Sequence, residues 1–192
     1  MSLVETAIQM RVVYQGELLT IRKDSVSLPD ASKATREYVV HPGACVVIPQ
    51  IRPGLYVFER QFRYPLRQVF IEFPAGKLDK QESALVCAQR ELKEETGYSA
   101  ENWLHLGVMH NCIGYSNEKI EIFLASDLRP GNQALDSGEF LELFEMSLDE
   151  AEDAVRKGLL TDAKTITCLF WLRMIEGRHE AKIGSLADQI GR

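Results

Sequence analysis

Residues 76–98 read GKLDKQESALVCAQRELKEETGY, and this stretch decides the fold. From Ser83 to Thr96 it contains no proline or glycine and is rich in Ala, Leu, Gln, Glu and Lys, which predicts a helix. Ser83 is a suitable N-cap, and Gly97 can adopt the left-handed conformation that ends a helix. We therefore expect a loop, a helix and a second loop in this order.

The predicted helix carries acidic side chains one turn apart. Its apolar stripe is expected to consist of Leu85, Ala88 and Leu92. Glu91 and Glu95 lie at the edge of this stripe, where carboxylates repel each other more strongly than in water. A cation over them would relieve the repulsion, and Mg²⁺ or Mn²⁺ suits the site because no His or Cys joins the acidic face. Arg90 can hold Glu94 four residues later. The alternative is an ordinary solvated acidic face.

The fixed residues extend beyond the helix. In order, the sequence has Gly76, five residues, Glu82, seven residues, and then Arg-Glu-Leu-x-Glu-Glu-x-Gly with a large apolar residue after it. This pattern resembles the Nudix box at every fixed position, and only the aromatic Tyr98 departs from the usual aliphatic residue. The resemblance implies a Nudix hydrolase, which splits a nucleoside diphosphate linked to a further group.

Composition supports a small enzyme. The 192 residues can bury a sizeable core, and a net charge of −6 without a basic run argues against nucleic-acid or membrane-surface binding. No apolar stretch approaches the roughly 18 residues of a membrane helix, and the first residues lack a signal-peptide pattern. The cysteines show no metal-binding spacing, so we expect reduced thiols and a cytoplasmic protein.

The order of predicted strands and helices indicates the α/β (α+β) class. The Nudix resemblance implies an α/β/α sandwich with a mixed sheet. We divide the chain into an N-terminal antiparallel β extension (1–40), a Nudix domain (41–178) and a C-terminal tail (179–192). Within the extension, residues 7–28 predict strands and 29–36 a turn-like linker. Such an extension is too short to bury a core alone, so we expect a homodimer.

Later segments carry further signals. Strands are predicted at 55–62, 68–76, 102–111, 119–128 and 139–146, with a mobile loop at 129–138. Ser147 and Glu150 form a capping box that opens a helix at 148–157. Asp162 can cap the final helix, 163–175. The core positions of that last helix are expected to be Ile166, Leu169, Phe170 and Met174.

Segments outside the box resemble the ADP-ribose pyrophosphatase branch of the family. They are Arg36-Glu37 before VVHPGACVVIP, QFRYP (61–65) before EFPAG (72–76), and GEFLE (138–142). In that branch two subunits exchange N-terminal strands and share each active site. The resemblance implies substrate-binding roles for Arg36, Glu37, Arg63 and Glu72, with the two arginines on the diphosphate or ribose.

One position departs from the branch. Where a proline is usual, sixteen residues after Gly97, the chain has Ile113. ADP-ribose remains the expected substrate, to be split into AMP and ribose 5-phosphate. GDP-mannose or another nucleotide sugar is the alternative. A nucleotide sensor without catalysis is a second alternative, which the complete acidic set disfavours.

The expected mechanism needs cations before hydroxide can approach a charged diphosphate. By resemblance, Glu91, Glu95 and the Ala75 carbonyl hold the metal, which lowers the pKa of a bound water. Glu94 and Arg90 complete the catalytic residues of the box. Glu139 is the expected general base.

The base has two alternatives, Glu142 and His110. The aromatic residue that stacks on the nucleobase stays open among Tyr14, Tyr38 and Tyr115.

Overall fold

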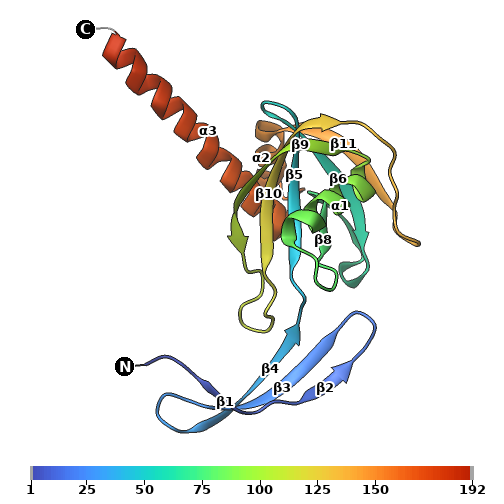
Figure 1. Ribbon diagram of the computed structural model, residues 1–192, viewed down its shortest axis with the longest axis vertical. Coiled ribbons are helices and arrows are strands. Elements are labelled where there is room, and N and C mark those ends of the chain that lie inside the picture. The colour runs from blue at the N-terminus through green and yellow to red at the C-terminus, as the bar shows by residue number, and fades with distance from the viewer. Residues whose placement is uncertain (1, 191–192) are drawn as a thin grey trace.

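The computed structural model describes residues 2–190, and their side chains through residue 176. Figure 1 shows a layered domain, an N-terminal sheet below it and a long C-terminal helix that projects away. The elements are β1 (Thr6–Gln9), β2 (Val12–Gln15), β3 (Thr20–Ser27), β4 (Lys33–Val40), β5 (Ala44–Arg52), β6 (Leu55–Arg63), η1 (Tyr64–Leu66), β7 (Gln68–Glu72), β8 (Ala75–Lys77), α1 (Ala84–Thr96), β9 (Ser99–Met109), β10 (Ile120–Arg129), β11 (Leu141–Ser147), α2 (Leu148–Arg156) and α3 (Ala163–Ile190).

The N-terminal sheet is antiparallel, with β3 paired to β1, β2 and β4. Every residue of β1 and β2 is exposed in the single chain. The predicted linker at 29–36 is too long, because β4 begins at Lys33. The reversal is tight because the Asp30 carboxylate accepts hydrogen bonds from the Ser32 amide and hydroxyl, which frees the next residues to pair with β3.

The domain is built on a mixed seven-stranded sheet. The order is β11-β6-β5-β10-β9, with β7 beside β6 and β8 beside β5. Strands β5 and β10 run parallel and the other neighbours run antiparallel. Side chains alternate along β5, so Cys45 and Val47 face one side while Val46 and Ile48 face the other, and all four are fully buried. The sheet therefore supports a core on each face.

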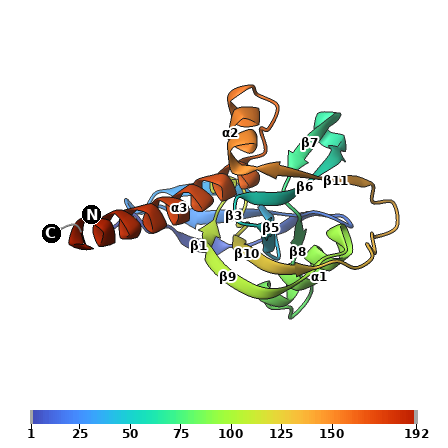
Figure 2. The ribbon, with the colours of Figure 1, turned by 90° about the horizontal axis from the view of Figure 1, so that it is seen from above.

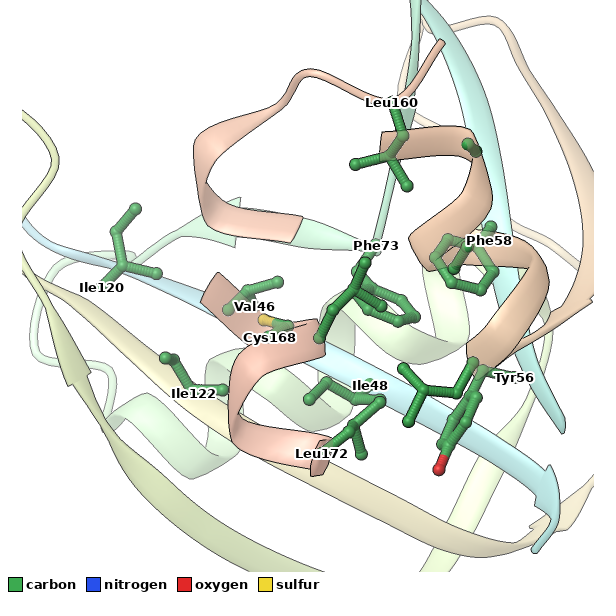
Figure 3. Close-up of a cluster of buried hydrophobic side chains, with 14 of the residues drawn as sticks. Val46, Ile48, Tyr56, Phe58, Phe73, Ile120, Ile122, Leu160, Cys168 and Leu172 are labelled. Carbon is green, nitrogen blue, oxygen red and sulfur yellow. The ribbon is translucent and has the colours of Figure 1, made fainter. Parts of the chain in front are cut away.

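Helices cover both faces (Figure 2). Helix α1 packs Cys87, Ala88 and Leu92 against one side. Helices α2 and α3 cover the other, where Phe58 stacks on Phe73 with ring centroids 4.2 Å apart (Figure 3). The predicted α/β/α sandwich is confirmed. Within the described residues no helix combines the length and apolar character needed to cross a membrane.

Two predicted apolar faces are partly wrong, although Ala88, Leu92 and Leu169 are buried as expected. On α1, Leu85 is 39% exposed and Cys87 takes its place in the core. On α3, Ile166 and Phe170 are exposed. The positions that α3 buries are Thr165, Cys168, Leu169 and Leu172. On α3 the reason is a long-range contact, because the Thr165 hydroxyl accepts a hydrogen bond from the Phe73 amide at 3.0 Å and so holds that face against the sheet.

The helix caps agree with the sequence. Ser83 and Gly97 flank α1, and the capping box of Ser147 and Glu150 opens α2. The Asp162 carboxylate accepts from the Thr165 amide at 2.9 Å at the start of α3. Helix α3 continues past residue 178 to Ile190, with side chains from residue 177 outside the described ones. The predicted division into three segments stays a prediction.

Candidate active site

A cleft of about 550 Å³ opens beside the N-terminal part of β8. Its walls come from β5, β6, β7, β8, α1, the loop before β11 and the first turn of α3. The polar lining includes Arg63, Glu72, Lys77, Glu91, Glu94, Glu95, Asn111, Glu118, Asp136, Glu139, Asp162 and Lys164. Several of the residues predicted from the sequence are therefore brought together here.

The loop before β11 is fixed at one end by the C-terminus of α1. Gly97 has φ 76°, and a Cβ there would lie 2.8 Å from the Gly131 carbonyl oxygen, so this close approach requires glycine. The Ala134 amide donates to the Glu94 carbonyl at 2.9 Å. The part of the predicted mobile loop after Ala134 lies free of these anchors, and its Asp136, together with Glu139 just after the loop, lines the cleft.

Arg90 organises the outer acids of the box. Its Nε and Nη2 donate to the Glu82 carboxylate at 3.0 Å, and its Nη1 donates to Glu91 at 2.7 Å and to Glu94 at 3.0 Å. It also donates to the Lys77 carbonyl at 3.1 Å. The hydrogen bonds from Arg90 lower the pKa of Glu82 to about 2. The expected contact with Glu94 is present, and the arginine ties the helix to the preceding loop.

The inner acid, Glu95, has no arginine partner among the described residues, and burial outweighs the Arg90 bond at Glu91. Glu95 is 4% exposed, and its Oε2 accepts from the Ala75 amide at 2.9 Å. Burial raises the pKa of Glu95 well above its ordinary value, and the charges of Glu59, Glu91 and Glu139 add to this. Burial also raises the pKa of Glu91, despite its hydrogen bond from Arg90.

A divalent cation fits these residues. A Cβ on Gly76 would lie 1.7 Å from Glu91 Oε1, so the carboxylate rests directly against the loop backbone. Glu91, Glu95 and the Ala75 carbonyl form a set of hard oxygens, and of the two carboxylates only Glu91 has an arginine partner among the described residues. Among the described residues, no three acidic, His or Cys side chains converge on one point, so the remaining ligands would be water or substrate oxygens.

The opposite wall carries basic groups. Arg63 donates to both oxygens of the buried Glu72 at 2.7 and 2.8 Å through Nε and Nη2, and its Nη1 makes no hydrogen bond among the described residues. Lys164, at the start of α3, contacts Glu72 as well and lies 3.1 Å from the Asp162 carboxylate. Sequence reasoning missed Lys164, although it stands two residues after the recognised cap.

Of the proposed bases, only Glu139 lines the cleft. Its Oε1 accepts from Gln61 Nε2 at 3.2 Å. Glu142 lies on the other face of β11, exposed and 3.2 Å from Arg60 Nη1. His110 is exposed and is not among the lining residues.

The remaining predicted substrate residues lie outside the cleft of their own chain. On β4, Arg36 pairs with Glu5 at 2.5 Å and Glu37 with Lys23 at 2.6 Å, all largely exposed. If Arg36 and Glu37 act on substrate, they must therefore do so in the cleft of a second subunit.

Sequence reasoning also missed Glu59, which appeared to be part of an ordinary buried strand. It is 1% exposed, and its Oε2 has no hydrogen-bond partner among the described residues. Burial, with the neighbouring charge of Glu72, raises the pKa of Glu59 to about 8. The sequence did contain a signal for a buried acid, because Glu59 directly follows the apolar run Leu55-Tyr56-Val57-Phe58 of a predicted buried strand.

The sandwich and its acidic helix define a diphosphate-cleaving class of hydrolase, and comparison with known proteins agrees. The NUDIX domain matches residues 40–169. The chain belongs to this family and is a Nudix hydrolase.

Similar proteins cover nearly the whole chain. An ADP-ribose pyrophosphatase of Bacillus subtilis (strain 168) is 34% identical over 94% of this chain and 99% of its own length. A methanol dehydrogenase activator of Bacillus methanolicus is 36% identical over 90% and 94%. A solved structure titled as an ADP compounds hydrolase superposes with a TM-score of 0.82 at 24% identity, covering 93% of this chain and 98% of that one, which supports the fold.

Proposed function

We propose that this enzyme hydrolyses the diphosphate bond of a nucleoside diphosphate sugar, with ADP-ribose as the main substrate and AMP and ribose 5-phosphate as products. The observation that carries the proposal is the cleft itself, which is lined both by the acids Glu91 and Glu95 and by the basic side chains of Arg63 and Lys164. This arrangement suits a charged diphosphate between a cation and fixed basic groups. The B. subtilis relative named for this activity matches over almost its whole length.

The cation is proposed to be Mg²⁺, with Mn²⁺ as the alternative, held by Glu91, Glu95 and the Ala75 carbonyl. When bound, it would neutralise phosphate charge and lower the pKa of a bound water. Arg90 keeps Glu91 and Glu94 in position through bonds of 2.7 and 3.0 Å. The charge of Arg90 is paired with Glu82, Glu91 and Glu94. Glu95 therefore stays available to the cation.

Proton transfer is assigned to Glu139. Water attacks one phosphorus, the bridging P–O bond breaks, and the electron pair leaves on the second phosphate. Glu139 takes the proton of the attacking water. Gln61 orients the Glu139 carboxylate through its 3.2 Å bond to Oε1. Arg63 offers its Nη1 to the substrate while Glu72 holds the rest of the guanidinium.

The working form is proposed to be a homodimer. The N-terminal sheet exposes a set of large apolar side chains, namely Leu3, Val4, Ile8, Met10, Val12, Val13, Tyr14, Leu18 and Leu19. A free sheet of this kind is unfavourable in water, so a second copy would cover it. Leu18 already lines the cleft, which places the extension next to the site and supports Arg36 and Glu37 acting in the cleft of the other subunit.

A small-molecule substrate and a cytoplasmic location complete the proposal. The net charge of −6 argues against a polyanionic partner. The four cysteines are free thiols, which suits a reducing compartment.

GDP-mannose is the second candidate substrate. Ile113, in place of the usual proline, is 85% exposed on the loop between β9 and β10. The differing names of the relatives also show that membership of the family does not fix the substrate. The test is a panel of ADP-ribose, GDP-mannose, ADP-glucose, NADH and dGTP with Mg²⁺ and a coupled phosphatase. Fastest release from ADP-ribose supports the proposal, and no release from any of them supports a sensor.

A further inference from the structure

One face of β6 runs from Arg63, which lines the cleft, back into the protein interior behind the lining residues. Side chains alternate along a strand, so Glu59, Gln61 and Arg63 share that face. Arg63 reaches Glu72, and Gln61 donates to Glu139, both of which line the cleft. Glu59 stands directly opposite Glu72 in the register of β6 and β7, and directly opposed residues point to the same side of a sheet. Glu59 therefore forms the deep end of this polar row.

Two oxygens of this row have no donor. Glu59 Oε2 and Gln61 Oε1 are both inaccessible and make no hydrogen bond among the described residues. The Gln61 amide cannot be turned to satisfy its oxygen, because its nitrogen donates to Glu139 at 3.2 Å. Buried acceptors without donors cost free energy. A group that carries donors or positive charge belongs beside them.

The neighbouring basic side chains do not fill this role. Arg63 and Lys164 lie close enough to stabilise a charge on Glu59, but both make their bonds to Glu72. Glu95 lies on the other side, close enough for its charge and that of Glu59 to oppose each other. Glu59 is thus a strand neighbour of the compensated Glu72 and close enough to Glu95, an acid of the cation site, for their charges to oppose each other.

An acid at this position is not required by the strand. Val57 and Phe58 before it are buried apolar residues, and a valine would fit the sheet without leaving an unpaired oxygen. The strand itself therefore does not account for a carboxyl group at this position.

We propose that Glu59 is a positioning residue of the metal site, and that its free oxygen, with Gln61 Oε1, accepts hydrogen bonds from water molecules bound to the cation that Glu91 and Glu95 hold. This inference rests on the proposed metal-dependent function. It adds residues of β6 to a site otherwise built from the box, and it gives both unpaired oxygens a partner.

The test measures binding of Mn²⁺ alone, without substrate. Free Mn²⁺ is followed by electron paramagnetic resonance during titration of the wild type, Glu59→Gln, Glu59→Val and Glu145→Gln. Gln keeps the shape of Glu59 and removes its charge, and Val removes the polar atoms. Glu145→Gln removes one charge from an exposed position on β11 and controls for a general change in net charge. Far-UV circular dichroism checks folding, and Glu59→Gln is the variant most certain to fold.

Removing a partner of metal-bound groups weakens affinity roughly 10–100-fold, so we expect Kd to rise by about that factor in Glu59→Gln and Glu59→Val. Glu145→Gln should bind as the wild type does. Unchanged Kd in folded Glu59→Gln overturns the inference and leaves Glu59 beside an ordinary buried water. An equal loss in Glu145→Gln also overturns it. A wild type that does not bind Mn²⁺ overturns the proposed metal-dependent function itself, which the substrate panel would show independently.

Discussion

The Glu91 carboxylate lies against the backbone of Gly76, where a Cβ would come within 1.7 Å of Oε1. The first residue of the box and an acid of its helix are thus matched in space. Any side chain at position 76 must displace either the loop, which is paired to β5 through Cys45, or the carboxylate. This contact explains physically why the motif begins with glycine.

Gly76→Ala should therefore lower kcat/KM sharply. A displacement of about 1 Å in a catalytic group can cost about 10²-fold, and the Cβ forces at least such a shift of Glu91. The measurement is steady-state kinetics with Mg²⁺, with circular dichroism to confirm folding. Gly114→Ala is the control, because a Cβ there meets nothing within 4 Å. Near-normal activity in Gly76→Ala would show that Glu91 is not part of the site.

Glu95→Gln should reduce turnover by several orders of magnitude while the fold persists. The amide oxygen of Gln can still accept the Ala75 amide bond, but it cannot replace a carboxylate on a divalent cation. Activity is measured over a range of Mg²⁺ concentrations. Near-normal turnover in this variant would mean that α1 does not carry the metal site.

Glu95→Gln also tests the raised pKa of Glu95, through the pH dependence of stability measured in EDTA so that no metal is bound. The pKa of Glu95 is raised above 4.5 in the folded protein, whereas the unfolded chain releases this proton near 4.5. The folded state thus binds more protons above that pH, and wild-type stability falls as pH rises. The melting temperature of Glu95→Gln minus that of the wild type should be positive and should grow from pH 5 to pH 9. A difference that stays flat contradicts the burial of an uncompensated charge. Glu142→Gln is an exposed control.

Local signals in the sequence predicted the local structure well. The caps of α1 at Ser83 and Gly97 are where expected, because capping depends on a few adjacent residues. The predicted apolar stripe of α1 was wrong at Leu85. Helix α1 buries Glu95 instead, whose carboxylate accepts a hydrogen bond from the Ala75 amide on strand β8. Periodicity carries no information about such long-range bonds.

The far wall of the cleft was not predictable from one sequence. Glu59 on β6 and Lys164 on α3 are distant along the chain and meet only because β6, β7 and the start of α3 pack together. Arg63 and Glu72 were recognised by resemblance alone, and their ion pair depends on the hairpin register. Placement of Arg36 depends on a partner chain and stays a prediction.

Light scattering should show a homodimer at micromolar concentration. Ile8→Glu and Val12→Glu place charge on the exposed β1 and β2, so we expect monomers with a folded domain and reduced activity. Leu104→Glu, at an equally exposed apolar position on β9, should remain dimeric. A monomeric wild type would remove the dimer and the shared role of Arg36 together.

The general base is tested by Glu139→Gln against Glu142→Gln. Glu139 faces the cleft and is held by Gln61, whereas Glu142 faces Arg60 on the opposite side of β11. Loss of a general base typically costs about 10²–10⁴-fold, so kcat should fall by that order in Glu139→Gln. KM should change little, because proton removal matters only in the transition state.

Glu142→Gln should keep kcat within a small factor of the wild type. Both variants are assayed with ADP-ribose and with a nucleoside triphosphate, and the wild type should cleave ADP-ribose faster, as the proposed function requires of a cleft lined by Arg63 and Lys164. Two results would each contradict a different part of the proposal. Normal kcat in Glu139→Gln transfers the role to another group, with His110→Ala as the next variant. A clear preference for GDP-mannose keeps the proposed mechanism and replaces the proposed substrate, because the proton transfer assigned to Glu139 does not depend on which sugar is bound.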